Sequence, residues 1–237
     1  MIIFASAKIN LCLDIIEKHK SGYHKIQTVY KEIKSLQNKV TIKAKTDNSN
    51  MSRANTPQSE TCKMAIQIMH NSFTGNKIPQ IEIVRNIPFS SGLGGESSNA
   101  AAIIKGLNVL WDLNLSNNQL REIAEKIGMD VSFFIEGGTA IGSNFGEKIT
   151  QLDDINLDLE IFAKSSELKN KTKTAFSNID LSKCGKNKEK TKKLIEAIKQ
   201  KDLESIKGNI HNDFELIYKI NNGEFLSGAG PSTFKLK

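Results

Sequence analysis

A stretch rich in glycine and serine carries the first candidate chemistry in this sequence. Residues 88–99 read Pro-Phe-Ser-Ser-Gly-Leu-Gly-Gly-Glu-Ser-Ser-Asn, and an apolar run from Ala100 to Trp111 follows. Glycines allow a tight turn in which several backbone N–H groups point to one side. The apolar run predicts a buried helix, whose positive end would face that turn. The combination is typical of a loop that binds phosphate groups.

The spacing of this loop excludes two common phosphate-binding motifs. It has no Gly-Lys-Ser/Thr ending, and its glycines do not follow the G-x-G-x-x-G pattern. Taken alone, the stretch is equally compatible with an ordinary connection between packed elements. Other residues with chemical potential must therefore decide between the two interpretations.

A strand pattern near the N-terminus brings a cation and an amide together. From Ala5 to Ile15 every odd position is apolar, whereas Lys8 and Asn10 occupy even positions. A period of two predicts a half-buried strand, with Lys8 and Asn10 side by side on the face opposite the core. The alternative is an amphipathic strand with a plain polar surface.

Two further segments place polar groups at turns. Tyr23 and His24 follow a Ser-Gly turn, and the alternative is that they are exposed side chains without a role in binding. Asp130 lies between a helix stop at Gly128 and an apolar run, where a carboxylate with a capping role is the ordinary interpretation.

The elements that must position these residues follow from periodicity. The patterns predict strands at 40–45, at 81–84 and from 157, a loop at 46–59, and helices at 61–73, 100–111 and, from a capping box of Ser116 and Gln119, up to 127. A further apolar stripe at 194–206 predicts a helix. The glycine-rich segment 137–146 is expected to end a first domain.

Composition limits the classes of protein. The 237 residues suffice for one large domain or two small ones, with no apolar run long enough to span a membrane and no signal-like start, so we expect a cytoplasmic protein. Three scattered cysteines indicate neither a disulfide framework nor a zinc site.

The net charge of +7 is local. Residues 164–207 hold 13 lysines and 6 acidic residues, which accounts for the whole excess. Without interleaved aromatic residues or arginines, this stretch favours a solvated surface over a nucleic-acid interface.

Three strings together resemble the motifs of the GHMP kinases, a family of small-molecule kinases. The first is Ala-Lys-Ile-Asn-Leu at 7–11 with Gly-Tyr-His at 22–24, the second is the loop at 88–99, and the third is Leu-Ser-Gly-Ala-Gly-Pro-Ser-Thr-Phe at 226–234. They occur in the family's order, with an Asn-Asp-x-Glu string at 212–215 before the third. Three ordered motifs are far more specific than one.

The resemblance implies an α+β protein with the two-domain GHMP kinase fold. It implies a ribosomal protein S5 domain 2-like N-terminal domain at 1–152 and a shortened ferredoxin-like C-terminal domain at 153–237. The implied activity is transfer of a phosphoryl group from ATP, with Mg²⁺, to the 2-hydroxyl of a small-molecule substrate, a cytidine diphosphate-linked methylerythritol, in the non-mevalonate route to isoprenoid precursors. A monomer or homodimer without nucleic-acid or membrane partners is expected.

The resemblance also implies roles for individual residues. Lys8 and Asp130 would be catalytic, Asp130 as the acid/base, and Ser97 or Ser98 would lie close to the metal. The remaining candidates are ATP-binding Phe89, Ser90, Ser91, Gly92, Leu93, Gly94, Gly95, Glu96, Ser97, Ser98 and Asn99, and substrate-binding Asn10, Tyr23, His24, Thr172 and Phe176. The alternative to substrate binding by Phe176 is a position in the hydrophobic core.

The sequence departs from the family pattern at several places. Ser21, Ser132 and Ala229 replace an Asp, a Pro and a Ser, and Glu96 stands where the loop's last Gly is expected. Glu96 either points outward or contacts the metal. The connections at 46–59 and from Phe214 to Leu226 are short. Another GHMP kinase, acting on homoserine, mevalonate or a sugar, and a non-catalytic nucleotide- or RNA-binding relative therefore remain alternatives.

Overall fold

The computed structural model describes residues 1–44, 59–168 and 171–237. These residues form two compact units, each assembled from separate segments of the chain. The first unit contains Met1–Ala7, Lys34–Ile87 and Gly94–Glu136, and the second contains Lys8–Ile33, Pro88–Leu93 and Gly137–Lys237. The predicted loop at 46–59 lies outside the described residues except for Ser59.

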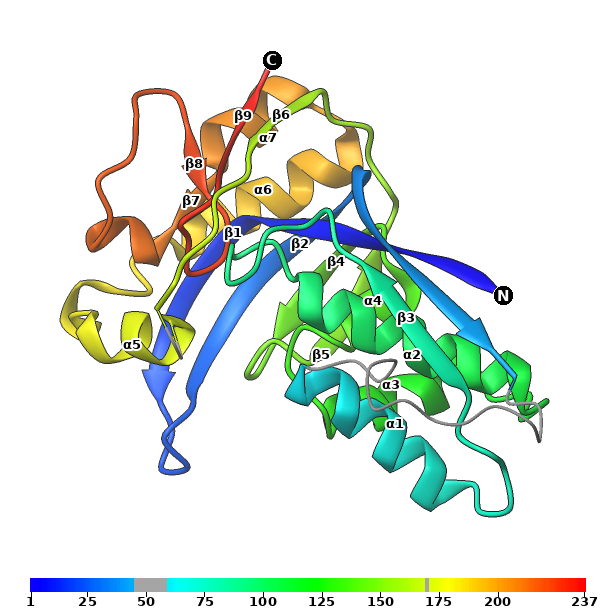
Figure 1. Ribbon diagram of the computed structural model, residues 1–237. Coiled ribbons are helices and arrows are strands. Elements are labelled where there is room, and N and C mark those ends of the chain that lie inside the picture. The colour runs from blue at the N-terminus through cyan, green and yellow to red at the C-terminus, as the bar shows by residue number, and fades with distance from the viewer. Residues whose placement is uncertain (45–58, 169–170) are drawn as a thin grey trace. The chain divides into compact units, whose positions relative to one another are not determined.

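The strands are β1 (Ile2–Lys18), β2 (His24–Lys43), β3 (Gln80–Val84), β4 (Thr139–Ser143), β5 (Lys148–Leu152), β6 (Leu159–Phe162), β7 (His211–Asn212), β8 (Phe225–Leu226) and β9 (Thr233–Leu236). The helices are α1 (Glu60–Ser72), α2 (Gly95–Leu110), α3 (Asn117–Glu125), α4 (Phe133–Glu136), α5 (Lys171–Asn178), α6 (Lys188–Gln200) and α7 (Leu203–Asn209). Single 3₁₀ turns lie at Leu181–Lys183 and Asp213–Leu216. Segregated helices and mainly antiparallel strands confirm the α+β class (Figure 1).

In the first unit, the helices α1 to α4 gather beside the paired ends of β2 and β3. β3 pairs antiparallel with β2, with Val40 opposite Ile83, and α2 packs against α1 and α4 (Figure 1). α2 is buried on most sides because its middle, from Ala100 to Ile104, consists of alanine and isoleucine. Gly106 allows a close approach, since a Cβ atom there would lie 2.2 Å from Cδ1 of Ile42.

In the second unit, β4 pairs with both β2 and β5, and β7 pairs parallel with β1. A separate three-stranded sheet has the order β6-β9-β8. The core of this unit joins distant segments: Leu13 and Ile15 of β1 pack with residues of α5 and with Phe214. Apolar residues of α6 and α7 are buried on one face, as the apolar stripe of each requires.

Most of the predicted elements are confirmed. The strands at the N-terminus and at 81–84, the helix at 61–73 and the strand after 157 are β1, β3, α1 and β6. The capping box is also present. The backbone N–H of Gln119 donates to the Ser116 hydroxyl oxygen at 3.4 Å, and the side-chain oxygen of Gln119 accepts from the Ser116 N–H at 2.9 Å.

Several boundaries are corrected. α2 begins at Gly95 and not at Ala100, because the second half of the glycine-rich loop is already its first turn. α3 ends at Glu125 instead of Ile127. The stripe at 194–206 is two helices, since Lys201 adopts a left-handed conformation and Asp202 caps α7. The strand expected at 40–45 is the end of β2, which starts at His24.

The burial of β1 differs most from the expectation. Residues from Ala5 to Ile15 are all buried, so the strand is covered on both faces and Lys8 and Asn10 do not lie on an open surface. In the second unit the polar face is covered by C-terminal residues: Thr191 of α6 and His211 of β7 both bond to Asp14.

The connection from Phe214 to Leu226 contains the end of a 3₁₀ turn and no α-helix. From Ile217 to Glu224 the chain forms turns and extended connections before β8 begins. The predicted division into domains 1–152 and 153–237 stays a prediction, because a compact unit is not necessarily a domain that folds independently.

Candidate active site

The first half of the glycine-rich loop lies against two segments that are distant in sequence. The backbone N–H of Lys8 donates to the carbonyl oxygen of Leu93 at 2.9 Å. The N–H of Ser232 donates to the Ser91 carbonyl at 3.0 Å, and the Ser227 hydroxyl donates to the Gly92 carbonyl at 3.1 Å. The second unit therefore unites parts of all three motifs.

Lys8 and Asn10 are side by side, as predicted. Nζ of Lys8 donates to Oδ1 of Asn10 at 2.7 Å, and Nδ2 of Asn10 donates to the Thr28 hydroxyl at 2.7 Å. Thr28 in turn donates to the Cys12 carbonyl at 2.6 Å. Nζ of Lys8 also lies 5.7 Å from the centroid of the Tyr30 ring. This chain of bonds fixes the direction in which the Lys8 ammonium points.

A glycine of the third motif approaches the Lys8 ammonium closely. Gly228 has φ +54°, and a Cβ atom there would lie 3.2 Å from Nζ of Lys8. Asn212 holds this turn, because its amide donates to the carbonyls of Leu226 and Gly228 at 3.0 and 2.9 Å. The Asn-Asp-x-Glu string thus positions the third motif, and its Glu215 accepts the N–H of Leu226 at 3.0 Å.

The second half of the loop belongs to the first unit and begins α2. Gly94 has φ +75° and is the N-cap, with its carbonyl accepting the Ser98 N–H at 2.9 Å. A Cβ atom on Gly95 would lie 3.0 Å from the Ile87 side chain. Ser97 and Ser98 stand in the first turn of α2. The first backbone N–H groups of a helix have no acceptor within that helix, as an anion site requires.

Glu96 is held by a partner that the sequence did not reveal. Its carboxylate forms an ion pair with the Arg85 guanidinium, just after β3. The other carboxylate oxygen, Oε2, is buried and has no hydrogen-bond partner among the described residues. Glu96 therefore does not simply point outward.

Asn38 is a second positioning residue that sequence reasoning missed. Its buried Oδ1 accepts the N–H groups of Asn86 and Ile87 at 2.8 and 2.9 Å. Its Nδ2 donates to Oδ1 of Asn99 at 3.0 Å. It thus ties β2 to the loop entrance and to α2, and no local motif signals such a long-range contact.

Asp130 lies in the turn between α3 and α4. The turn is closed by the Val131 N–H, which donates to the Gly128 carbonyl at 3.1 Å. Lys105 of α2 donates to the Phe134 carbonyl at 3.0 Å, which fixes α4 against the helix that carries the loop. Asp130 belongs to the first unit and Lys8 to the second, so their joint action stays a proposal.

The candidate nucleoside-binding residues form aromatic contacts in the second unit. Tyr23 is 56% exposed, and its ring packs against Phe145 with 5.8 Å between centroids. The rings of His24 and Phe176 stack at 4.7 Å and 11°. Burial, aided by the charge of Lys18, lowers the pKa of His24, which favours the neutral imidazole at pH 7.

Phe176 packs against the core, and its predicted contact with the substrate stays a prediction. One contact is the stack on His24, and another is the edge-to-face contact with Phe214 at 4.8 Å, which joins it to the core. Thr172 is exposed on the same helix. Sequence reasoning missed Phe145, which lies in the connection between β4 and β5.

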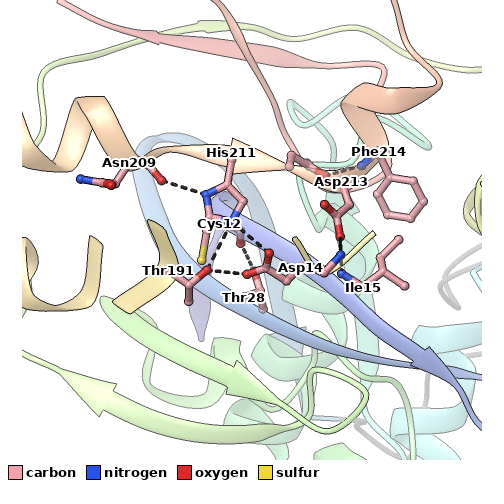
Figure 2. Close-up of polar contacts among 11 residues, drawn as sticks. Cys12, Asp14, Ile15, Thr28, Thr191, Asn209, His211, Asp213 and Phe214 are labelled. Carbon is pink, nitrogen blue, oxygen red and sulfur yellow. Dashed lines mark hydrogen bonds and ion pairs between the residues drawn. The ribbon is translucent and has the colours of Figure 1, made fainter. Parts of the chain in front are cut away.

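A buried polar cluster lies next to these elements (Figure 2). Nε2 of His211 lies 3.2 Å from Oδ1 of Asp14, and Thr191 bonds to the other carboxylate oxygen. Nδ1 of His211 lies 2.9 Å from the Asn209 carbonyl. Asp213, close by, accepts the Ile15 N–H at 2.7 Å.

This cluster has the residue types of a metal site but the bonding of a structural one. Ligand atoms of Cys12, Asp14 and His211 lie within 4.8 Å of one another. Burial, with the charge of Asp14, raises the pKa of the Cys12 thiol to about 12, so it stays protonated at neutral pH. The hydrogen bonds already occupy the carboxylate and the imidazole, and we interpret the cluster as an internal clamp between β1, α6 and β7.

The fold and the converging motifs define a class of protein, and comparisons name it. The family model described as "GHMP kinases N terminal domain" matches residues 60–138. A relative from Clostridioides difficile is 32% identical over 97% of this chain and 84% of its own length. The chain belongs to the GHMP kinase family. That relative is named 4-diphosphocytidyl-2-C-methyl-D-erythritol kinase.

Solved structures show the same fold. A crystal structure of 4-(cytidine 5'-diphospho)-2C-methyl-D-erythritol kinase matches with a TM-score of 0.71 at 21% identity, covering 100% of this chain and 90% of that one. The phosphomevalonate kinase of Streptococcus pneumoniae matches with a TM-score of 0.72 at 15% identity, covering 100% and 92%. The fold therefore does not by itself select the substrate.

Among the described residues, no helix is long and apolar enough to cross a membrane.

Proposed function

We propose that this chain transfers the γ-phosphoryl group of ATP to the 2-hydroxyl of 4-diphosphocytidyl-2-C-methyl-D-erythritol. The observation that carries the proposal is 32% identity across 97% of the chain to a kinase of that name. The convergence of the three motifs supports it, because Lys8 and the loop carbonyls of Gly92 and Leu93 are tied together in one unit.

The glycine-rich loop would hold the phosphates of ATP. Residues from Phe89 to Asn99 include the first turn of α2, which offers backbone N–H groups, and Gly94 adopts the left-handed conformation at the start of that helix. Phosphoryl transfer depends mainly on such alignment and on charge stabilisation.

Mg²⁺ is part of the proposal, and the residues at this helix end fit it. The buried Oε2 of Glu96 lacks a partner among the described residues, and Mg²⁺ prefers oxygen ligands such as carboxylates and hydroxyls. Ser97 or Ser98, in the same turn, would supply a hydroxyl. When bound, the ion would neutralise charge on the phosphate oxygens.

Asp130 and Lys8 would carry the chemical step. The Asp130 carboxylate would accept the proton of the 2-hydroxyl while the hydroxyl oxygen bonds to the γ-phosphorus and ADP leaves. The Lys8 ammonium would stabilise negative charge on the transferring group. Asn10 supports this role, since it orients the ammonium through a 2.7 Å bond.

The nucleoside end would use the aromatic residues of the second unit. The exposed ring of Tyr23 offers a face on which a base can stack, and the neutral His24 can bond to its edge. Phe176 and Thr172 of α5 would complete this end. Phe176 already orders the His24 ring by stacking.

The decisive experiment is an ADP-release assay with a panel of acceptors at physiological pH. We expect turnover with 4-diphosphocytidyl-2-C-methyl-D-erythritol and none above background with homoserine, mevalonate or galactose. Faster turnover with one of the other acceptors would replace the substrate named here. Asp130→Asn is the control for a contaminating kinase, because it should abolish the signal.

An RNA-binding role is the remaining alternative. Lysines of α6 are exposed, and two of them pair with acids of the same helix, Lys192 with Glu189 and Lys199 with Glu196. This arrangement supports a solvated face in a cytoplasmic enzyme. Steeply salt-dependent RNA binding without turnover would favour the alternative instead.

A further inference from the structure

Lys171, the first residue of α5, is a buried cation in a stretch of exposed ones. Its side chain is only 6% exposed, whereas the other described lysines of residues 164–207 are exposed. Its Nζ atom has no hydrogen-bond partner among the described residues. Burying an ammonium group without a partner is costly, so such a group points to a ligand that compensates it.

The surroundings of Lys171 indicate the charge of that ligand. Burial lowers the pKa of Lys171 to about 8, and the positive charge of Lys8 on β1 contributes to this lowering. The two ammonium groups thus act on each other within the second unit. An anionic group bound at Lys171 would offset both the repulsion by Lys8 and the cost of desolvation.

The third motif packs closely against Lys8, the charged neighbour of Lys171. Gly228 has no side chain, and a Cβ atom there would lie 3.2 Å from Nζ of Lys8 and 3.6 Å from Oδ1 of Asn10. Its left-handed backbone is held by Asn212.

We propose that Lys171 is a second phosphate-binding residue beside Lys8 and contacts phosphate oxygens of a bound reactant. The inference rests on the proposed function, in which both reactants carry phosphates: ATP, and the diphosphate of the acceptor. Lys171 is therefore a ligand contact, and Lys8 keeps the role in the chemical step.

Lys171→Met tests this proposal, because methionine has a similar length and no charge. Lys173→Met, on an exposed position of the same helix, is the matched control. Binding of CDP and of ADP is measured by calorimetry at pH 7, which needs no turnover and stays informative if the proposed substrate is wrong. We expect Lys171→Met to weaken the binding of one of the two nucleotides about 10- to 100-fold. The affinities of Lys173→Met should stay within about twofold of those of the wild type.

The two nucleotides separate the two possible sources of the phosphate. A selective loss of CDP binding assigns Lys171 to the acceptor diphosphate, and a selective loss of ADP binding assigns it to the donor. Without ligand, Lys171→Met should melt about 3–6 °C higher than wild type, because it removes an unpaired buried charge. A lower melting temperature with unchanged affinities for both nucleotides would overturn the proposal, since Lys171 would then be structural.

A measurement on the wild-type protein tests the proposal even if the Lys171→Met variant does not fold. At pH 8, phosphate groups are fully ionised, because their second pKa is about 6. Lys171 is partly deprotonated at that pH, and Lys8 is the charged neighbour that acts on it. Nucleotide binding should therefore take up protons, seen as a binding enthalpy that depends on the ionisation enthalpy of the buffer. The absence of proton uptake with both nucleotides would contradict the proposal.

Discussion

The carbonyl oxygen of Ser227 lies 2.3 Å from the position that a Cβ atom on Gly92 would occupy. The Gly230 carbonyl lies 2.8 Å from the same point, and Gly92 has φ +86°. Residues 135 positions apart in sequence thus approach so closely that only glycine is accommodated. The glycine-rich loop and the C-terminal motif depend on each other for their conformation.

Gly92→Ala should destabilise the protein by about 3 kcal/mol, from left-handed strain and from the clash with two carbonyls. Urea unfolding measures the effect. Gly75→Ala is the matched control, since Gly75 has φ +93° but a Cβ atom added there would meet nothing within 4 Å, and it should cost about 1 kcal/mol. Equal losses for both variants would show that the contact with Ser227 is absent in solution.

Asp130→Asn should keep the fold and lower kcat by about 10³-fold or more, because the amide is nearly isosteric but cannot accept the proton. The ADP-release rate and the melting temperature are measured together. Activity near that of wild type would remove Asp130 from the mechanism.

Tyr23→Ala should raise the KM for the acceptor about 10-fold or more and leave the KM for ATP nearly unchanged, because the exposed ring is proposed to stack on the base. Tyr23→Phe keeps the ring face and should behave like wild type. Equal effects on both substrates would contradict the stacking role.

The cluster of Asp14, Thr191 and His211 should make stability depend on pH. Burial opposes protonation of His211, but the bonds to Asp14 and Asn209 and the charges of Asp14 and Asp213 outweigh it and raise the pKa of His211 above 6.5. A raised pKa in the folded state stabilises the fold fully below about 6.5 and loses this contribution as the pH rises through the folded value.

His211→Gln should therefore cost about 2 kcal/mol at pH 6 and less at pH 8.5, as measured by urea unfolding at each pH. The cost should not vanish, because the variant still leaves Asp14 with fewer partners. His70→Gln in α1, outside the cluster, is the control. A loss for His211→Gln that does not change with pH would show that the imidazole is neutral in the folded protein.

Local patterns in the sequence determined much of this protein. The period of two predicted that Lys8 and Asn10 lie together, the capping box predicted the start of α3, and the glycines of the loop predicted a tight turn. These features depend on the chemistry of residues near one another in the chain. The order of the three motifs was also sufficient to identify the family.

Only the tertiary structure decided which polar groups are buried and what they contact. The burial of Lys171, the pairing of Glu96 with Arg85 and the stack of Phe176 on His24 each join segments that no short-range periodicity relates. β1 has an alternating pattern, yet it is buried on both faces because C-terminal residues cover its polar side. Desolvation depends on everything that packs around a group, and a sequence pattern records only the neighbours along the chain.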